Sequence, residues 1–114
     1  MKLITKRIAR DKTLLATLQS RGDDEELVRI IDHSFLAETK EALVPLADDL
    51  LHMGFSGVSI NAHPEAPQAF VLECTSFDCT EFHSVAKSSV LMALLAQTYS
   101  VRYEGWGCSV AKES

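Results

Sequence analysis

The sequence lacks the features that mark a membrane protein, an exported protein or a disulfide-stabilised scaffold. No apolar run approaches the roughly 20 residues of a membrane-spanning helix, and residues 1–7 lack the apolar segment of a secretory signal. The 3 cysteines form an odd set, which does not suit a framework of paired disulfides. We therefore expect a cytoplasmic protein with reduced thiols and no membrane association.

Motifs of common catalytic and phosphate-binding sites are also absent. The chain has no G-x-S-x-G nucleophile elbow, and the Gly-Phe-Ser-Gly segment at 54–57 has neither the lysine nor the following helix of a phosphate loop. Asp32 and His33 are neighbours on a predicted strand, so their side chains point to opposite faces and form no acid–base pair. We predict no catalytic residues and no enzymatic activity.

The spacing of cysteine and histidine favours structural residues over a metal site. Zinc ligands usually come in close pairs such as C-x₂-C, whereas Cys74 and Cys79 are separated by four residues and Cys108 lies far along the chain. Adding His63 or His83 brings the number of possible ligands to four, but their spacing does not match that of a zinc site. We predict buried thiols, with no metal and no cofactor.

Charge is acidic overall but uneven along the chain. The formal net charge of −5 argues against a binder of duplex nucleic acid, because such proteins need a basic surface. Six basic residues nevertheless crowd the first helix region: Lys2, Lys6, Arg7, Arg10, Lys12 and Arg21. They form either a small basic patch for RNA or an acidic partner, or the solvated face of a helix. We expect no direct binding of nucleic acid.

Hydrophobic periodicity predicts a single domain, residues 1–114, with alternating helices and strands. Helical spacing indicates helices over 4–20 and 38–53, the second containing Pro45, and a third helix that opens with a capping box of Asp78 and Glu81. Runs of β-branched and apolar residues indicate strands over 27–35, 55–62, 69–77 and 99–103.

This order of elements predicts an α+β fold. Without the first helix it is βαββαβ, the order of a ferredoxin-like sandwich with a four-stranded antiparallel sheet. Two right-handed crossovers place both later helices on one face of that sheet. The extra N-terminal helix then covers either an edge or the open face.

The most unusual stretch is Val-Arg-Tyr-Glu-Gly-Trp-Gly at 101–107. Val101 and Tyr103 alternate with polar residues, as in a half-buried strand, and the only tryptophan, Trp106, stands between two glycines. Glycine permits backbone conformations with positive φ. We predict that the strand ends here and holds the indole at a fixed angle, either as a core anchor or as an exposed hot spot for a partner.

This stretch resembles the C-terminal motif of the regulator of ribonuclease E activity B family. The resemblance extends to Asp32-His33 in the first predicted strand and to His52-Met53-Gly54-Phe55 at the end of the second helix, and it covers residues 24–110. It implies a ferredoxin-like α+β fold and a small cytoplasmic regulator without enzymatic activity. Members of this family bind ribonuclease E, mainly its non-catalytic scaffold, and reduce cleavage of some transcripts.

The resemblance also singles out candidate protein-binding residues. An acidic surface suits the basic, largely disordered segments of the ribonuclease scaffold. The candidates are Asp32, His33, Tyr103, Glu104, Gly105, Trp106 and Gly107. The alternative is a binding module for a different protein, such as a toxin, or a self-associating subunit in which an uncovered sheet face forms a homodimer.

Overall fold

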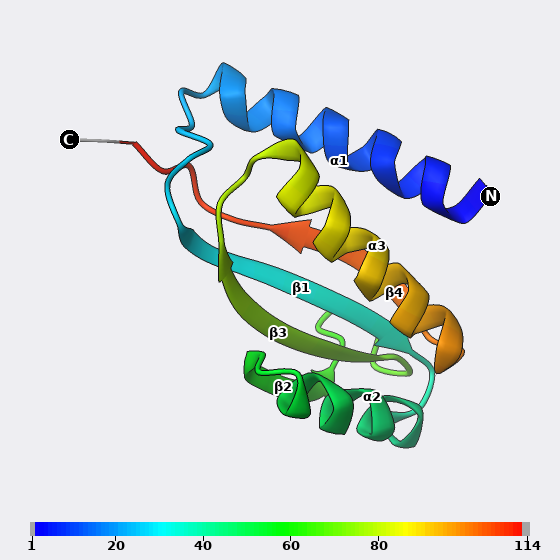
Figure 1. Ribbon diagram of the computed structural model, residues 1–114. Coiled ribbons are helices and arrows are strands. Elements are labelled where there is room, and N and C mark those ends of the chain that lie inside the picture. The colour runs from blue at the N-terminus through cyan, green and yellow to red at the C-terminus, as the bar shows by residue number, and fades with distance from the viewer. Residues whose placement is uncertain (1, 113–114) are drawn as a thin grey trace.

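The elements follow one another in the order α1-β1-α2-β2-β3-α3-β4 in the computed structural model, which describes residues 2–112 (Figure 1). Their bounds are α1 Lys2–Ser20, β1 Arg29–Ala37, α2 Lys40–His52, β2 Ser56–Ala62, β3 Phe70–Asp78, α3 Phe82–Thr98 and β4 Arg102–Gly107. The strands form one sheet in the order β2-β3-β1-β4, and every pairing is antiparallel. The predicted α+β fold with an extra N-terminal helix is confirmed.

The main core lies between one face of the sheet and the helices α2 and α3. Alternate strand residues point to the same face, so β1 contributes Phe35 while β3 contributes Leu72 and Cys74. The helices cover these side chains with the apolar residues Leu43, Leu46, Leu50, Met92, Ala93 and Ala96. Residues of the opposite sheet face, such as Ile30 and Phe77, are left exposed.

Helix α1 lies along α3 and leaves the open face of the sheet uncovered (Figure 1). Leu15 and Leu18 of α1 form a second, smaller cluster with Ile31, Val85 and Trp106. The helix therefore extends the helical layer on the side of β4, which is an edge strand of the sheet. None of the described helices is long and apolar enough to cross a membrane.

Helices α2 and α3 both begin later than the sequence predicted, at Lys40 and Phe82. Thr39 caps α2, because its hydroxyl accepts a hydrogen bond from the Ala42 N–H at 3.2 Å. The predicted capping box of Asp78 and Glu81 is wrong. Asp78 ends β3, where it pairs with β1, and its carboxylate accepts a hydrogen bond from the Cys79 N–H. Glu81 is the N-cap of α3, and its side chain makes no capping hydrogen bond.

Strand β4 begins and ends later than predicted. Tyr99 is the C-cap of α3 and Ser100 has a φ of 57°, so these residues complete the helix end instead of starting the strand. The strand then runs from Arg102 through Gly107. Trp106 therefore lies inside the sheet and not beyond the end of its last strand.

A β-bulge in β4 turns both aromatic residues of the motif toward the helices. Tyr103 and Trp106 are three positions apart, and in a regular strand they would point to opposite faces. The pairing of β4 with β1 skips Glu104, and this extra residue brings both rings to the same face. Gly105 has a φ of 129°, in the region that side chains other than glycine rarely adopt.

We predict that Gly105→Ala lowers the free energy of unfolding by about 1–3 kcal/mol, because alanine is strained at this positive φ. Space for the new methyl group exists, since the nearest atom lies 3.8 Å away on Arg7. Gly107→Ala is the matched control, because Gly107 has no such φ and no atom near its Cβ position. Urea unfolding of both variants checks this expectation, and equal stabilities would contradict it.

Candidate functional site

A buried carboxylate joins α1 to α3 and β4. Asp11 is fully buried. Its Oδ1 atom accepts a hydrogen bond from the Trp106 indole N–H at 2.9 Å, and its Oδ2 atom accepts one from the Ser89 hydroxyl. The Nε atom of Arg7, one turn earlier in α1, lies 3.4 Å from the same carboxylate. Because a buried charge persists only with such partners, these contacts set the position of α1.

Trp106 is a core anchor in this structure. Its side chain is 8% exposed and packs in the cluster with Leu15, Leu18 and Val85. The indole N–H, which needs a partner once buried, finds it in Asp11. A role for Trp106 in binding a partner stays a prediction, and its buried indole would act through the shape of the surface around it.

His33 extends the polar contacts into β1. Its Nδ1 atom lies 2.9 Å from the Tyr103 hydroxyl and its Nε2 atom 3.4 Å from the Ser76 hydroxyl. Burial lowers the pKa of His33 from 6.5 to about 4, against the opposing effect of the neighbouring Asp32 carboxylate. Burial also raises the pKa of Tyr103. Both side chains are therefore uncharged near neutral pH, and their contact holds β4 in register on β1.

The predicted binding residues divide between the two faces of the sheet. His33, Tyr103 and Trp106 are brought together on the helix-covered face, where all three are buried. Asp32 and Glu104 are exposed. The structure thus separates the candidate residues from the two sequence stretches into a buried structural group and a pair of surface acids.

An apolar cluster marks the open face of the sheet. Ile30 and Phe77 are direct cross-strand partners on β1 and β3, and they are 50% and 70% exposed, while the nearby Val28 is 68% exposed. Side chains of directly paired residues touch across a strand pair. Ile30 and Phe77, together with the exposed Val28 that precedes β1 in the chain, are called the open-face cluster, and the Ile30–Phe77 pair lies where β1 begins and β3 ends.

Acidic residues accompany the open-face cluster along the strands. Asp32 follows Ile30 by two residues, and Glu73 pairs with Ser34 on the same face. Glu104 is the bulged residue of β4, and its carboxylate is 3.6 Å from the exposed Arg102 guanidinium. The open face therefore combines apolar side chains with three carboxylates and one nearby cation.

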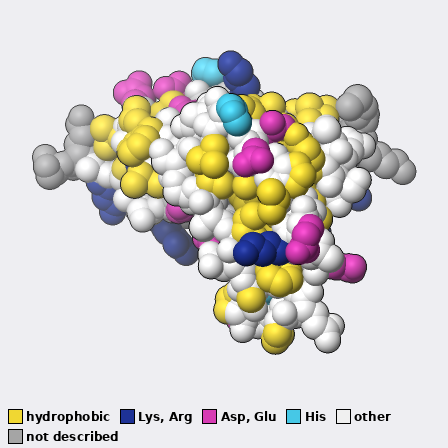
Figure 2. All heavy atoms as spheres, turned by 90° about the horizontal axis from the view of Figure 1, so that it is seen from below, with side chains coloured by type: hydrophobic (Ala, Val, Ile, Leu, Met, Phe, Trp, Pro, Cys, Tyr) yellow, Lys and Arg dark blue, Asp and Glu magenta, His cyan; other side chains and the backbone are white. Residues whose placement is uncertain are grey.

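Apolar side chains also reach the surface on the side of α2. Figure 2, which views the molecule from that side, shows them interrupted by charged side chains. The exposed apolar residues of this helix region are Val44, Leu51 and Met53. They lie on a helix whose inner face is already packed on the sheet, and they provide a reference surface for tests of the open face.

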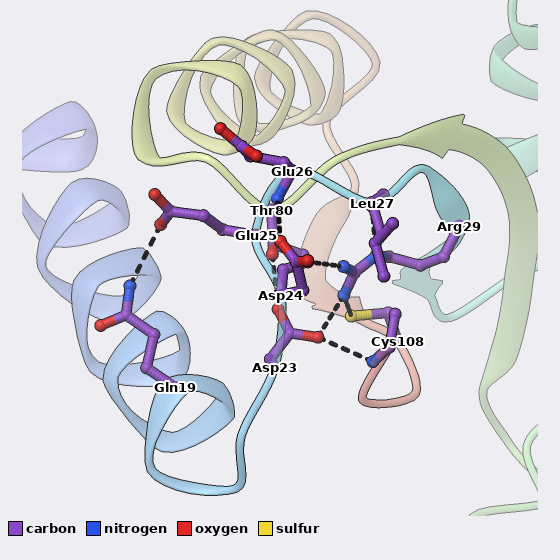
Figure 3. A network of polar contacts seen from close by, with 10 residues as sticks. Gln19, Asp23, Asp24, Glu25, Glu26, Leu27, Arg29, Thr80 and Cys108 are labelled. Carbon is purple, nitrogen blue, oxygen red and sulfur yellow. Dashed lines mark hydrogen bonds and ion pairs between the residues drawn. The ribbon is translucent and has the colours of Figure 1, made fainter. Parts of the chain in front are cut away.

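A second buried ion pair holds the segment that leads into β1 (Figure 3). The Asp23 carboxylate accepts hydrogen bonds from Arg29 at 2.6 Å, from the Thr80 hydroxyl at 2.7 Å and from the Ala111 N–H at 2.8 Å. Burial alone raises the pKa of Asp23, but these hydrogen bonds and the Arg29 charge outweigh it and lower the pKa below 3.8. Local sequence offered no sign of this role, because Ala111 is 88 residues away.

The three cysteines do not converge. Cys74 is buried in the main core, and burial raises its pKa to about 12. Cys79 and Cys108 are partly buried at other positions, and all three are free thiols. Within residues 2–112, no group of three or more His, Cys, Asp and Glu side chains is arranged to hold a metal ion.

The fold and these contacts define an α+β protein with one sheet face covered by helices and one face that no helix within residues 2–112 covers. Its sequence matches the family described as Regulator of ribonuclease activity B over residues 8–108. The chain therefore belongs to this family, as the resemblance of residues 101–107 predicted, and it is a regulator by family rather than a member of a catalytic family. A comparison with curated proteins finds no match.

We predict that stability falls as the pH is lowered from 6.5 to about 4, through the proton that unfolded His33 binds and folded His33 does not. The His33 contribution is complete above pH 6.5 and is lost by about pH 4, a change on the order of 3 kcal/mol. Denaturant unfolding across this range measures it. His33→Gln should flatten the profile, and exposed His83 provides the control His83→Gln. Identical profiles for both variants would refute the assignment.

We predict that Asp23→Ala lowers the free energy of unfolding by about 3–5 kcal/mol, because it leaves the buried Arg29 charge without its partner. Glu26→Ala, three residues later and exposed, should change it by less than about 0.5 kcal/mol. Thermal and urea unfolding of the two variants test the contrast. A small effect of Asp23→Ala would show that the network in Figure 3 contributes little to stability.

Proposed function

We propose that this protein is a non-enzymatic, cytoplasmic regulator that binds ribonuclease E and thereby modulates RNA degradation. Membership of the Regulator of ribonuclease activity B family supports a regulatory role with a protein partner. We further propose that the partner docks on the open face of the sheet. The exposed pair of Ile30 and Phe77 carries this assignment.

The physical basis of docking is the apolar area that the open-face cluster leaves in water. Full burial of a side chain such as Phe77 stabilises a complex by about 1.5–3 kcal/mol. Aromatic residues at the centre of an interface commonly supply much of its affinity. Phe77 is suited to this role, because it projects from β3 and most of its surface is exposed.

Acidic residues on the open face would attract a basic partner before contact is made. Asp32, Glu73 and Glu104 give the open face an excess of negative charge over the single Arg102. Such a surface attracts a basic segment and raises its association rate. The proposed partner region is therefore basic and carries at least one bulky apolar residue that can cover Phe77.

The motif at 101–107 serves this surface indirectly. The bulge turns Glu104 outward while Tyr103 and Trp106 anchor the strand from within. His33 holds the same strand through Tyr103. The motif thus shapes the edge of the docking face, and its exposed acid, Glu104, is the member that meets the partner.

We predict that Phe77→Ala weakens binding to the scaffold region of ribonuclease E by roughly tenfold or more, because a central aromatic anchor is lost. Asp32→Asn combined with Glu104→Gln should weaken it more at low salt than at high salt. Leu51→Ala, exposed on α2, is the control and should leave affinity unchanged. Surface plasmon resonance at two salt concentrations measures all three.

Three results would contradict this proposal. Absence of binding by the wild-type chain at micromolar concentration and low salt would remove the ribonuclease as partner. Sedimentation showing a stable dimer that Phe77→Ala dissociates would instead assign the open face to self-association. Equal affinities of Phe77→Ala and Leu51→Ala would place the interface elsewhere on the molecule.

A further inference from the structure

A cationic groove lies between α1, the end of α3 and the start of β4. Its volume is about 490 Å³, and its charged lining consists of Lys6, Arg7 and Arg10 from α1 with Arg102 from β4. None of the residues that line it is acidic. The chain has a net charge of −5. The groove therefore carries positive charge on a protein that is negatively charged overall.

The crowding of charge is not explained by folding. Lys6 and Arg10 are exposed and one helical turn apart on α1, and like charges at this spacing destabilise a helix. In the part of the chain that the structure describes, neither residue takes part in an ion pair. Residues that lower stability, and that make no stabilising contact to compensate, are typical of functional sites.

Arg7 adds a nearly buried cation to the lining of the groove. This residue is 8% exposed, and its Nε atom is buried without a hydrogen-bond partner among residues 2–112. Its distance of 3.4 Å to Asp11 is long for a charged hydrogen bond, since Trp106 and Ser89 already donate to that carboxylate. The guanidinium lies 5.1 Å over the Tyr103 ring, so the ion pair with Asp11 and the aromatic ring hold this cation in place beside the groove.

The remaining lining suits an organic molecule rather than a bare ion. Ala93, Ala96 and Val101 present apolar surface, and Gln97 adds an amide. The groove volume falls within the range of about 300–1,000 Å³ that is common for small-molecule sites. Apolar walls with a few convergent polar groups are the usual composition of such sites.

We infer that this groove binds a small organic phosphate of nucleotide size. Arginine and lysine form charge-assisted hydrogen bonds with phosphate oxygens, and two or more arginines suit a diphosphate. The four basic residues hold the phosphate groups, and the less polar part of the ligand lies against the alanine and valine side chains. This inference does not rest on the proposed function, because it concerns a different ligand and a groove that shares only Arg102 with the charged residues assigned to the open face.

Isothermal titration calorimetry of the full chain with ADP, inorganic pyrophosphate and adenosine tests the inference. ADP and pyrophosphate should bind, with affinity falling as salt rises, and adenosine should not. The double variant Lys6→Gln, Arg10→Gln should lose roughly tenfold or more in affinity. The matched control is Arg21→Gln, Lys87→Gln, which removes the same charge from exposed positions outside the groove and should bind as the wild type does.

These measurements distinguish binding in the groove from non-specific binding of phosphate by the charge of the protein. Chemical-shift changes at the amides of Gln97 and Val101 on addition of ADP to the wild type locate the site without any variant. No binding of either phosphate compound at low salt would overturn the inference. Equal loss of affinity in the two double variants would also overturn it, because net charge would then explain the binding. Binding of a single-stranded RNA that ADP does not displace would reassign the basic groove to nucleic acid.

Discussion

Burial of the Asp11 carboxylate is the constraint on which the arrangement of α1, α3 and β4 depends. The carboxylate accepts hydrogen bonds from the side chains of Ser89 on α3 and Trp106 on β4, and Arg7 supplies the opposite charge. An unpartnered buried charge is strongly unfavourable. The three elements are therefore held at one relative position, since displacement of α3 or β4 would remove one of the donors to the buried carboxylate.

This constraint separates the two surfaces of functional interest. The bulge at Glu104 lets Trp106 reach Asp11 while the Glu104 side chain faces outward. Because α1 is drawn beside α3, the open face of the sheet stays uncovered, and a groove forms where α1 meets the start of β4. One buried contact thus underlies both the proposed protein-docking face and the proposed phosphate groove.

Local patterns predicted the elements well and their ends less well. Apolar periodicity located every helix and strand, because it reflects burial within one element. The ends depend on competition between elements. Asp78 has the spacing of a helix cap, yet pairing with Arg29 of β1 keeps it in the sheet. Residues 99–100 were predicted to start the last strand, but they complete the end of α3. The bulge in β4 depends on its pairing with β1.

The sequence by itself determined the order of elements, the α+β class and the family, since these follow from local periodicity and from one distinctive motif. Only the tertiary structure decided which members of that motif are buried, that Asp23 is an internal ion-pair partner, and that basic residues of α1 gather around a groove with Arg102. The reason is distance along the chain. Asp11 and Trp106 are 95 residues apart, and no local pattern reports a contact that exists only after the sheet has assembled.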